Sequence, residues 1–140
     1  MPELPSTHAP PLIRTDFTSD QVWDEIKTDV ERVTPEGFQA WIAFLEDRGL
    51  EGLGEDALAE RMPRDYPSGY QHPVVFIVDR VTVTDPERPI LVISSYDEHP
   101  GRFRCLPSTV QAIQNNLTLA NLDFVDFAGA VDGDGVFRGF

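Results

Sequence analysis

The run VVFIV at residues 74–78 constrains the fold of this chain more than any other stretch. β-Branched and aromatic residues favour strands, and a run without polar alternation is typical of a strand covered on both faces. Such strands lie at the centre of sheets flanked by helices. The run therefore predicts a layered α/β fold with this strand near its middle.

Further segments supply the elements that such a fold needs. Alternating strand and helix patterns in the first half predict parallel strands joined by right-handed crossovers. The stretch EHPG at 98–101 predicts a hairpin. The predicted strands are 11–15, 38–47, 72–79, 90–97 and 102–107, and the predicted helices are 19–32, 55–62 and two that follow Ser108. Thr18 is expected to cap the first helix and Ser108 the third.

Together these segments predict a three-layer α/β domain with a mixed, mostly parallel five-stranded sheet, a C-terminal strand hairpin and two C-terminal helices. The first and third strands are expected to be neighbours at the centre of the sheet. The domain is expected to span 11–140. Residues 1–10 are rich in proline and show no apolar periodicity, so we expect a flexible arm.

The charge balance is the strongest global property of the chain. It holds 24 acidic and 11 basic residues, which gives a net charge of −13. A surface this acidic repels phosphate backbones, so nucleic acid is a disfavoured partner. A protein partner with a basic surface is favoured instead. Solubility alone would also explain the acidic composition.

Compartment and covalent chemistry are also constrained. The single cysteine, Cys105, excludes an internal disulfide and the usual structural zinc sites, and it suits a reducing compartment. The N-terminal stretch lacks a secretory pattern, and no apolar run is long enough for a membrane helix. We therefore expect a cytoplasmic protein without a membrane partner. Strand alternation points Cys105 into the core, where a thiol behaves as a small hydrophobe.

Charged residues follow three of the predicted strands. Arg14 and Asp16 end the first, Glu46 the second and Asp79 the third. In open α/β sheets ligands bind beyond the carboxyl ends of the strands, so these carboxylates could hold Mg²⁺ while Arg14 meets an anion. The alternative is that Asp16 and Asp79 cap helices or turns and Arg14 pairs with one of them. Asp85, before Pro86, suits a type I turn.

The C-terminal stretch QNNLTLANLDFVDFAGAVDGDG at 114–135 carries several motifs. Its Asn-x-Thr triplet could be glycosylated only in a secreted protein, so we expect it to be unmodified. Its DGDG stretch lacks the ligands and the length of a calcium-binding loop, so we expect no calcium site. Asn121 or Asp123 is expected to cap the last helix. Asn115 and Asn116 are expected to bond backbone in a neighbouring loop, with a ligand as the alternative.

The stretches PLIRTDFTSDQVW, HPVVFIVDRVTVTDPERPILV, FRCLPSTVQAIQNNLTLANLDFVDFA and VDGDGVFRGF resemble a family of small actinobacterial proteins catalogued as a domain of unknown function. The resemblance covers roughly 11–140 and implies a cytoplasmic single-domain protein with no assigned activity. Gln114 departs from the glutamate expected there, which weakens an acid–base role. The resemblance implies that polar residues recur among the members of that family at the positions of Arg14, Asp16, Asp79, Thr84, Asp85, Asn115, Asn116, Asn121 and Asp123.

The sequence is consistent with two main functions. The first is an acidic binding module without catalysis or cofactor, such as an immunity-type or accessory factor for a basic partner protein. The second is a small ligand-binding domain or Mg²⁺-assisted enzyme that uses Asp16, Asp79 and Glu46, with Arg14 on an anionic substrate and Asn115 or Asn116 orienting it. A subunit of a larger assembly is a third possibility. The oligomeric state is left open.

Overall fold

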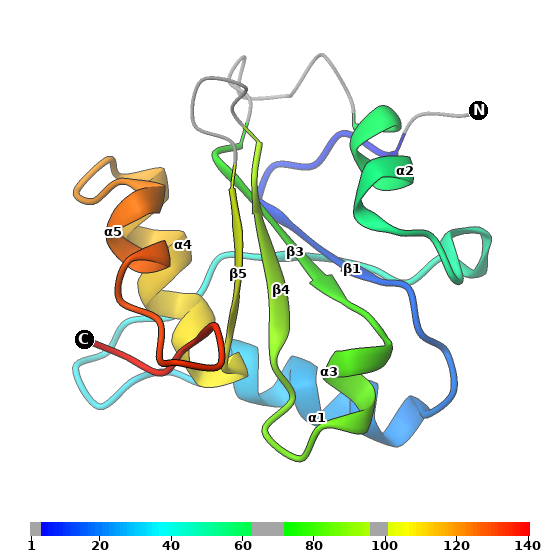
Figure 1. Cartoon of the computed structure of the whole chain (residues 1–140), viewed down its shortest axis with the longest axis horizontal. Coiled ribbons are helices and arrows are strands. Elements are labelled where there is room, and N and C mark those ends of the chain that lie inside the picture. The colour runs from blue at the N-terminus through cyan, green and yellow to red at the C-terminus, as the bar shows by residue number, and fades with distance from the viewer. Residues whose placement is uncertain (1–3, 63–71, 96–100) are drawn as a thin grey trace.

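The computed structural model describes residues 4–62, 72–95 and 101–140. These form a mixed α/β fold with a six-stranded sheet and five α-helices (Figure 1). The elements are β1 (Pro11–Arg14), α1 (Asp20–Glu31), β2 (Ala43–Leu45), α2 (Glu55–Glu60), β3 (Val74–Val78), α3 (Arg80–Thr84), β4 (Ile90–Ser94), β5 (Arg102–Cys105), α4 (Val110–Thr118), α5 (Phe124–Ala128) and β6 (Val136–Phe137), with 3-10 turns η1 (Arg48–Leu50) and η2 (Pro107–Thr109).

The sheet order is β2-β1-β3-β4-β5-β6. Strands β2, β1 and β3 are parallel, β3, β4 and β5 form antiparallel pairs, and β6 runs parallel to β5. The predicted adjacency of the first and third strands is confirmed, with Leu12 opposite Phe76. The antiparallel pairing of the predicted hairpin strands is confirmed for β4 and β5, while residues 98–100 of the predicted EHPG turn lie outside the described residues.

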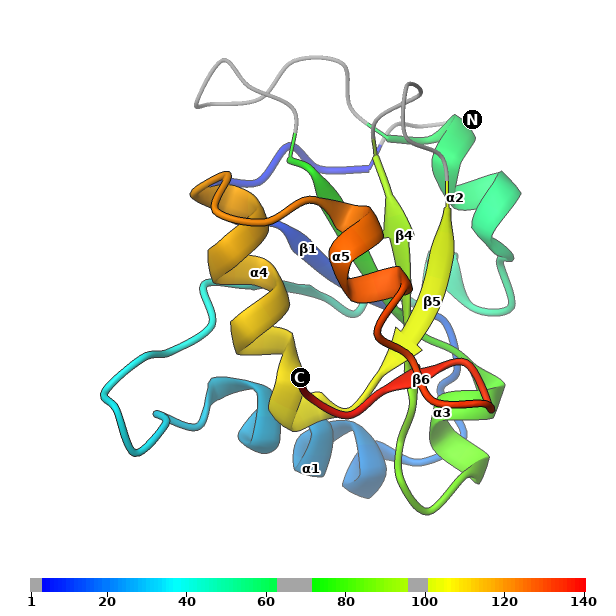
Figure 2. The ribbon, with the colours of Figure 1, turned by 60° about the vertical axis from the view of Figure 1, so that its left-hand side comes forward.

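A sixth strand corrects the expected count of five. The stretch VFRGF was expected to be a tail, but Val136 and Phe137 pair with β5 (Figure 2). The turn before them returns the chain, since the Gly135 N–H donates to the Asp132 carbonyl at 2.9 Å. Two paired residues are too few for sequence alternation to reveal.

Alternate residues of the central strand face two separate clusters. Phe76 belongs to the larger one, which contains Trp23 of α1 and Ile113 of α4. Ile77 belongs to the smaller one, which contains Leu58 of α2. All five residues of β3 are buried, as the unbroken apolar run predicted.

The two faces of the sheet are covered unequally, which refines the expected three layers. Figure 1 shows α4 and α5 on one side of the sheet and α2 on the other. Helix α1 packs in the same cluster as α4 and α5, whereas η1, α2 and the start of the chain cover the opposite face. None of the helices in the described ranges combines the length and apolar character that crossing a membrane requires.

Strand β2 is much shorter than the predicted 38–47. Its neighbour β1 begins with Pro11, after Pro10, and neither proline has an N–H group with which to extend the ladder. Pairing starts where the Ala43 N–H donates to the Pro10 carbonyl at 3.0 Å. Residues 38–42 therefore have a strand-like sequence but do not form part of a strand.

Local capping also differs from the sequence expectation. Ser19, not Thr18, caps α1, because its hydroxyl accepts from the Val22 N–H at 3.2 Å. Helix α4 follows η2 and has Thr109 rather than Ser108 before its first residue. Helix α3 occupies part of the stretch expected to be a plain connection.

The described part of the predicted arm lies against the domain. Leu4 is 5% exposed and packs in the smaller cluster. Its N–H donates to the Arg61 carbonyl at 2.7 Å. The flexibility of residues 1–10 stays a prediction, but Leu4 and the buried Ala9 contribute to the fold.

Cys105 lies in the core, as strand alternation predicted. It is fully buried, and burial raises the pKa of the Cys105 thiol to about 12 against the lowering effect of a hydrogen bond from Thr109. We expect Ellman's reagent to leave the folded protein unlabelled and to label one thiol at once in denaturant. Rapid labelling of the native protein would contradict this burial.

Candidate functional site

Arg14, at the end of β1, is enclosed by its own neighbourhood. Its side chain is 4% exposed and lies over the ring of Phe17, with its guanidinium carbon 4.4 Å from the ring centroid. It donates to the Asp20 carboxylate at 2.8 Å and to the Asp16 carbonyl at 3.1 Å. The guanidinium is thus occupied by the start of α1, which argues against a free anion-binding arginine.

Asp16 and Glu46 each serve a local contact. The Asp16 carboxylate accepts from the Thr18 N–H at 2.9 Å and from its hydroxyl. The Glu46 carboxylate accepts from the Trp23 indole N–H at 2.8 Å and lies 3.9 Å from Arg14. The alternative in which Asp16 caps a turn matches these contacts, but the expected pairing of Arg14 with Asp16 or Asp79 is wrong, because the carboxylates beside Arg14 are those of Asp20 and Glu46.

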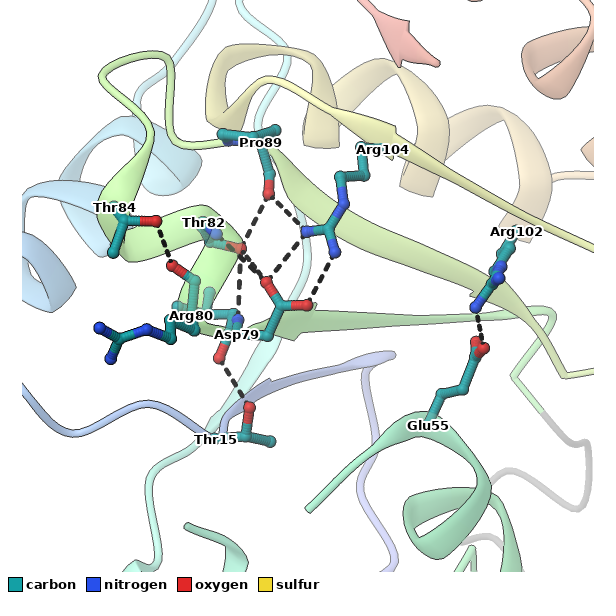
Figure 3. A network of polar contacts seen from close by, with 10 residues as sticks. Thr15, Glu55, Asp79, Arg80, Thr82, Thr84, Pro89, Arg102 and Arg104 are labelled. Carbon is teal, nitrogen blue, oxygen red and sulfur yellow. Dashed lines mark hydrogen bonds and ion pairs between the residues drawn. The ribbon is translucent and has the colours of Figure 1, made fainter. Parts of the chain in front are cut away.

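Asp79 caps α3 and holds β5 at the same time (Figure 3). Its carboxylate accepts from the Thr82 N–H at 3.1 Å, while the Thr82 hydroxyl accepts from the Asp79 N–H at 3.2 Å. Arg104 of β5 donates to both carboxylate oxygens, at 2.9 and 2.8 Å. This fork geometry is the strong form of an ion pair.

The electrostatics of Asp79 follow from these contacts. Burial acts to raise its pKa, but the hydrogen bonds from Arg104 and the Thr82 N–H outweigh burial and hold the pKa below the ordinary value of 3.8. The carboxylate therefore stays ionised at neutral pH, bound to a guanidinium and a helix N-terminus.

The lowered pKa predicts a pH dependence. The Asp79 contacts stabilise the fold fully above the ordinary pKa, and that stability is lost as the pH falls through the folded-state pKa. We expect the difference in unfolding free energy between wild type and Asp79→Asn to be constant from about pH 7 to about pH 5 and to shrink below about pH 4. Urea unfolding across this range measures it. A difference that grows as the pH falls would contradict the assigned direction.

The predicted magnesium ligands do not come together. Asp79 is directed to Arg104, whereas Asp16 and Glu46 lie around the Arg14 side of the sheet. Within the described residues no group of three or more His, Cys, Asp or Glu side chains is placed to hold a metal ion. At the carboxyl ends of β1 and β3 the Thr15 hydroxyl and the Thr15 N–H both donate to the Val78 carbonyl.

A charged hollow of about 490 Å³ lies beside Asp79. Arg102 and Arg104 alternate along β5 and both line it, but Arg102 pairs with Glu55 of α2 and Arg104 with Asp79 (Figure 3). Asp134, also in its wall, pairs with Arg138 at 2.7 Å. The first two ion pairs hold β5 to α2 and to the start of α3, and the third joins the two sides of β6. Together they satisfy these charges of the hollow internally.

The remaining sequence candidates form turns. The Asp85 carboxylate accepts from the Glu87 N–H at 2.9 Å and its carbonyl from the Arg88 N–H at 3.0 Å, which makes the expected turn. Asp123 precedes α5 as its N-cap residue, and its N–H donates to the Asp126 carboxylate at 2.8 Å. The Asn121 N–H donates to the Asn116 carbonyl at 2.9 Å.

The two adjacent asparagines behave differently. The Asn115 side chain donates to the Gln39 carbonyl in the loop after α1, as expected, although the distance is 3.3 Å. Asn116 instead donates to the Ala112 carbonyl of its own helix at 2.8 Å. The prediction of bonds to a neighbouring loop is thus confirmed for Asn115 and wrong for Asn116, because Asn116 reaches the carbonyl one turn back.

Gln114 is the most informative residue of this stretch. It is 2% exposed, and its Oε1 accepts from the Trp41 N–H at 2.7 Å and from the Asn115 side chain at 2.6 Å. Its amide donates to the Thr118 hydroxyl at 3.1 Å. Gln114 therefore fastens the loop after α1 to helix α4, a role that helix periodicity alone does not reveal.

That loop exposes large apolar side chains. We call residues 33–41 the contact segment. Val33, Phe38 and Trp41 are 54%, 58% and 55% exposed. Elsewhere in the described chain such residues occur singly, at Val81, Leu119, Val125 and Phe140. Figure 2 shows the segment between α1 and β2 projecting from the body on the side of α4.

The contact segment is held by a dense set of hydrogen bonds. The Thr34 N–H donates to the Phe38 carbonyl at 2.7 Å, and the Thr34 hydroxyl accepts from the Phe38 N–H at 3.0 Å. The Gln39 side chain donates to the Glu31 carbonyl at 2.6 Å. Gly37 has a φ of 89°, which the turn requires and glycine supplies without strain.

The model of the family described as Domain of unknown function (DUF6924) matches residues 9–140. The chain belongs to this family. The resemblance to a domain of unknown function is thereby confirmed, and the family's description assigns no activity. A search of curated proteins gave no match.

In this DUF6924 chain we expect Gln114→Leu to lower the free energy of unfolding by about 2 kcal/mol, because the Trp41 N–H and the Asn115 amide lose a buried acceptor. Urea unfolding measures the loss, and amide exchange at Trp41 should accelerate. Gln111→Leu, on the same helix and with its side chain bonded to Asn115 one turn away, is the matched control with an expected change under about 0.5 kcal/mol. Equal losses would refute the fastening role.

Proposed function

We propose that this protein is a non-catalytic, cytoplasmic binding module that docks a basic partner protein through the contact segment. The observation that carries the proposal is the exposure of Val33, Phe38 and Trp41 within nine residues of a hydrogen-bonded loop. Aromatic side chains dominate the binding energy of protein interfaces. A backbone ordered before binding reduces the entropy lost on association.

Charge around the segment supports the nature of the partner. Residues 24–47 hold seven acidic residues and two basic ones. Both bases are already paired, Lys27 with Asp24 at 3.7 Å and Arg32 with Asp29 at 3.1 Å. The unpaired excess is negative, so it would accelerate encounter with a basic surface and disfavour nucleic acid.

The state of the polar candidates supports a role without catalysis. Asp79 is engaged by Arg104, Asp16 by Thr18, and Glu46 by the Trp23 indole. Cys105 is buried and its thiol pKa is raised, which disfavours nucleophilic use. The single cysteine suits the reducing cytoplasm.

Affinity capture tests the proposal. The immobilised protein is incubated at low salt with an extract of the cells in which its gene occurs, and bound proteins are eluted by a salt gradient and identified. We expect a partner of high isoelectric point whose purified form binds with a Kd that rises with salt. A captured protein whose affinity is independent of salt, or the absence of any saturable partner, would contradict the proposal.

A further inference from the structure

Strand β2 leaves one edge of the sheet open. It is the terminal strand of the sheet order, and the described chain places β1 alone beside it. The sequence FQAWIAFL at 38–45 contains no charged residue and no proline. Native edge strands are ordinarily protected by such residues because an unpaired edge recruits another strand. This edge lacks that protection.

The backbone direction of the edge follows from two hydrogen bonds. The Ala43 N–H points inward, to the Pro10 carbonyl. The Trp41 N–H, two residues earlier, points to the same side and donates to the Gln114 side chain. Gln114 therefore supplies at Trp41 the acceptor that a neighbouring strand would otherwise supply. Because peptide groups alternate along an extended strand, those of Ile42 and Phe44 face outward, toward the open edge.

A hollow accompanies the edge. Its volume is about 610 Å³, and its wall includes the consecutive residues Phe44, Leu45, Glu46 and Asp47. The hollow adjoins the end of β2 on the face covered by η1 and the start of the chain. Leu4 and Leu50 supply further apolar wall.

The charges around β2 indicate what kind of segment would bind at the open edge. Glu36 precedes the uncharged stretch, and Glu46 and Asp47 follow it. A second copy of this chain carries the same net charge of −13 and the same acids beside β2, so charge disfavours pairing between two copies. A segment with basic residues at both ends meets opposite charges instead.

We propose that the partner adds an extended segment, apolar in its middle and basic at its ends, as a strand on the open edge of β2. This inference rests on the proposed function and specifies its mode of recognition. Backbone bonds to Ile42 and Phe44 would supply affinity, while the adjoining contact segment and the flanking acids would supply specificity.

A random 12-residue peptide library displayed on phage is the probe. We expect selection on the immobilised protein to enrich peptides with lysine or arginine around an apolar core. Synthetic versions of one such peptide are then N-methylated on alternate backbone amides, in two complementary sets. The set whose amides face β2 should bind at least tenfold more weakly than the unmodified peptide, and the other set should bind within about threefold of it.

The outcomes separate this inference from the proposed function. Basic peptides that need Phe38 and Trp41 but respond equally to both methylation sets would overturn strand addition and leave the binding module standing. Peptides without basic residues, binders indifferent to both aromatic side chains, or a library without binders would count against both. Sedimentation showing a dimer that Ile42→Pro dissolves while the fold is retained would assign the edge to a second copy and overturn the inference.

Discussion

Replacing Asp79 with alanine is expected to lower the free energy of unfolding by about 3 kcal/mol. The substitution removes the cap of α3, because the Thr82 N–H loses its acceptor. It also leaves Arg104, whose side chain is 23% exposed, without the carboxylate that binds it at two positions. Loss of a cap costs about 1 kcal/mol, and a partly buried guanidinium left unpaired costs more.

Two controls isolate the cause. Asp79→Asn keeps an oxygen for the Thr82 N–H and should lose roughly half as much stability, since only the ion pair is weakened. Glu55→Gln disrupts the pair with Arg102, whose side chain is 67% exposed, so a change under about 0.5 kcal/mol is expected. Urea unfolding of the three variants at neutral pH makes the comparison. Similar losses at Asp79 and Glu55 would show that the Asp79 network has no special weight.

The second large effect concerns binding rather than stability. The double variant Phe38→Ala/Trp41→Ala should weaken the affinity for the captured partner at least 100-fold, which corresponds to about 3 kcal/mol. Both side chains are more than half exposed in the free protein, so stability should change by less than about 1 kcal/mol. Calorimetry gives the Kd, and urea unfolding gives the stability.

The matched control is Leu119→Ala/Val125→Ala. These residues are apolar, 69% and 62% exposed, and lie outside the contact segment. Their removal should change the Kd by less than about twofold. Equal weakening in both double variants would mean that apolar surface acts non-specifically, and an unchanged Kd in the Phe38/Trp41 variant would place the interface elsewhere.

Much of the fold follows from sequence because its signals are local. The apolar run at 74–78 implies a buried central strand, and the helical spacing of Trp23, Ile26 and Val30 implies α1. The hairpin and the parallel order of the first three strands follow from connection rules. These predictions are confirmed because the hydrophobic periodicity of each segment agrees with its burial in the folded structure.

The missed features depend on distant partners. Strand β6 exists because Gly135 and Phe137 carbonyls accept from β5 and the residue after it. Strand β2 stops short because Pro10 and Pro11 lie opposite its start. Neither fact is visible within the segment concerned, so periodicity alone overestimates β2 and misses β6.

The candidate site shows the same division. Sequence located the charged residues at the strand ends, yet it could not show that the partner of Asp79 is Arg104, 25 residues away and two strands across the sheet. It also treated Gln114 as a departure from an expected glutamate. The structure places its acceptor against the Trp41 N–H, 73 positions earlier, where a neutral amide at a buried position satisfies a backbone donor without burying a charge.

Amide hydrogen exchange of the complex tests the central claim most directly. With the purified partner bound, exchange should slow mainly across residues 33–45, including the outward-facing amides of Ile42 and Phe44, while the amides around Asp79 and Arg104 keep their free-protein rates. Protection centred instead on β5, β6 or the charged hollow at Arg102, with residues 33–45 unchanged, would contradict the assignment of the contact segment as the binding surface.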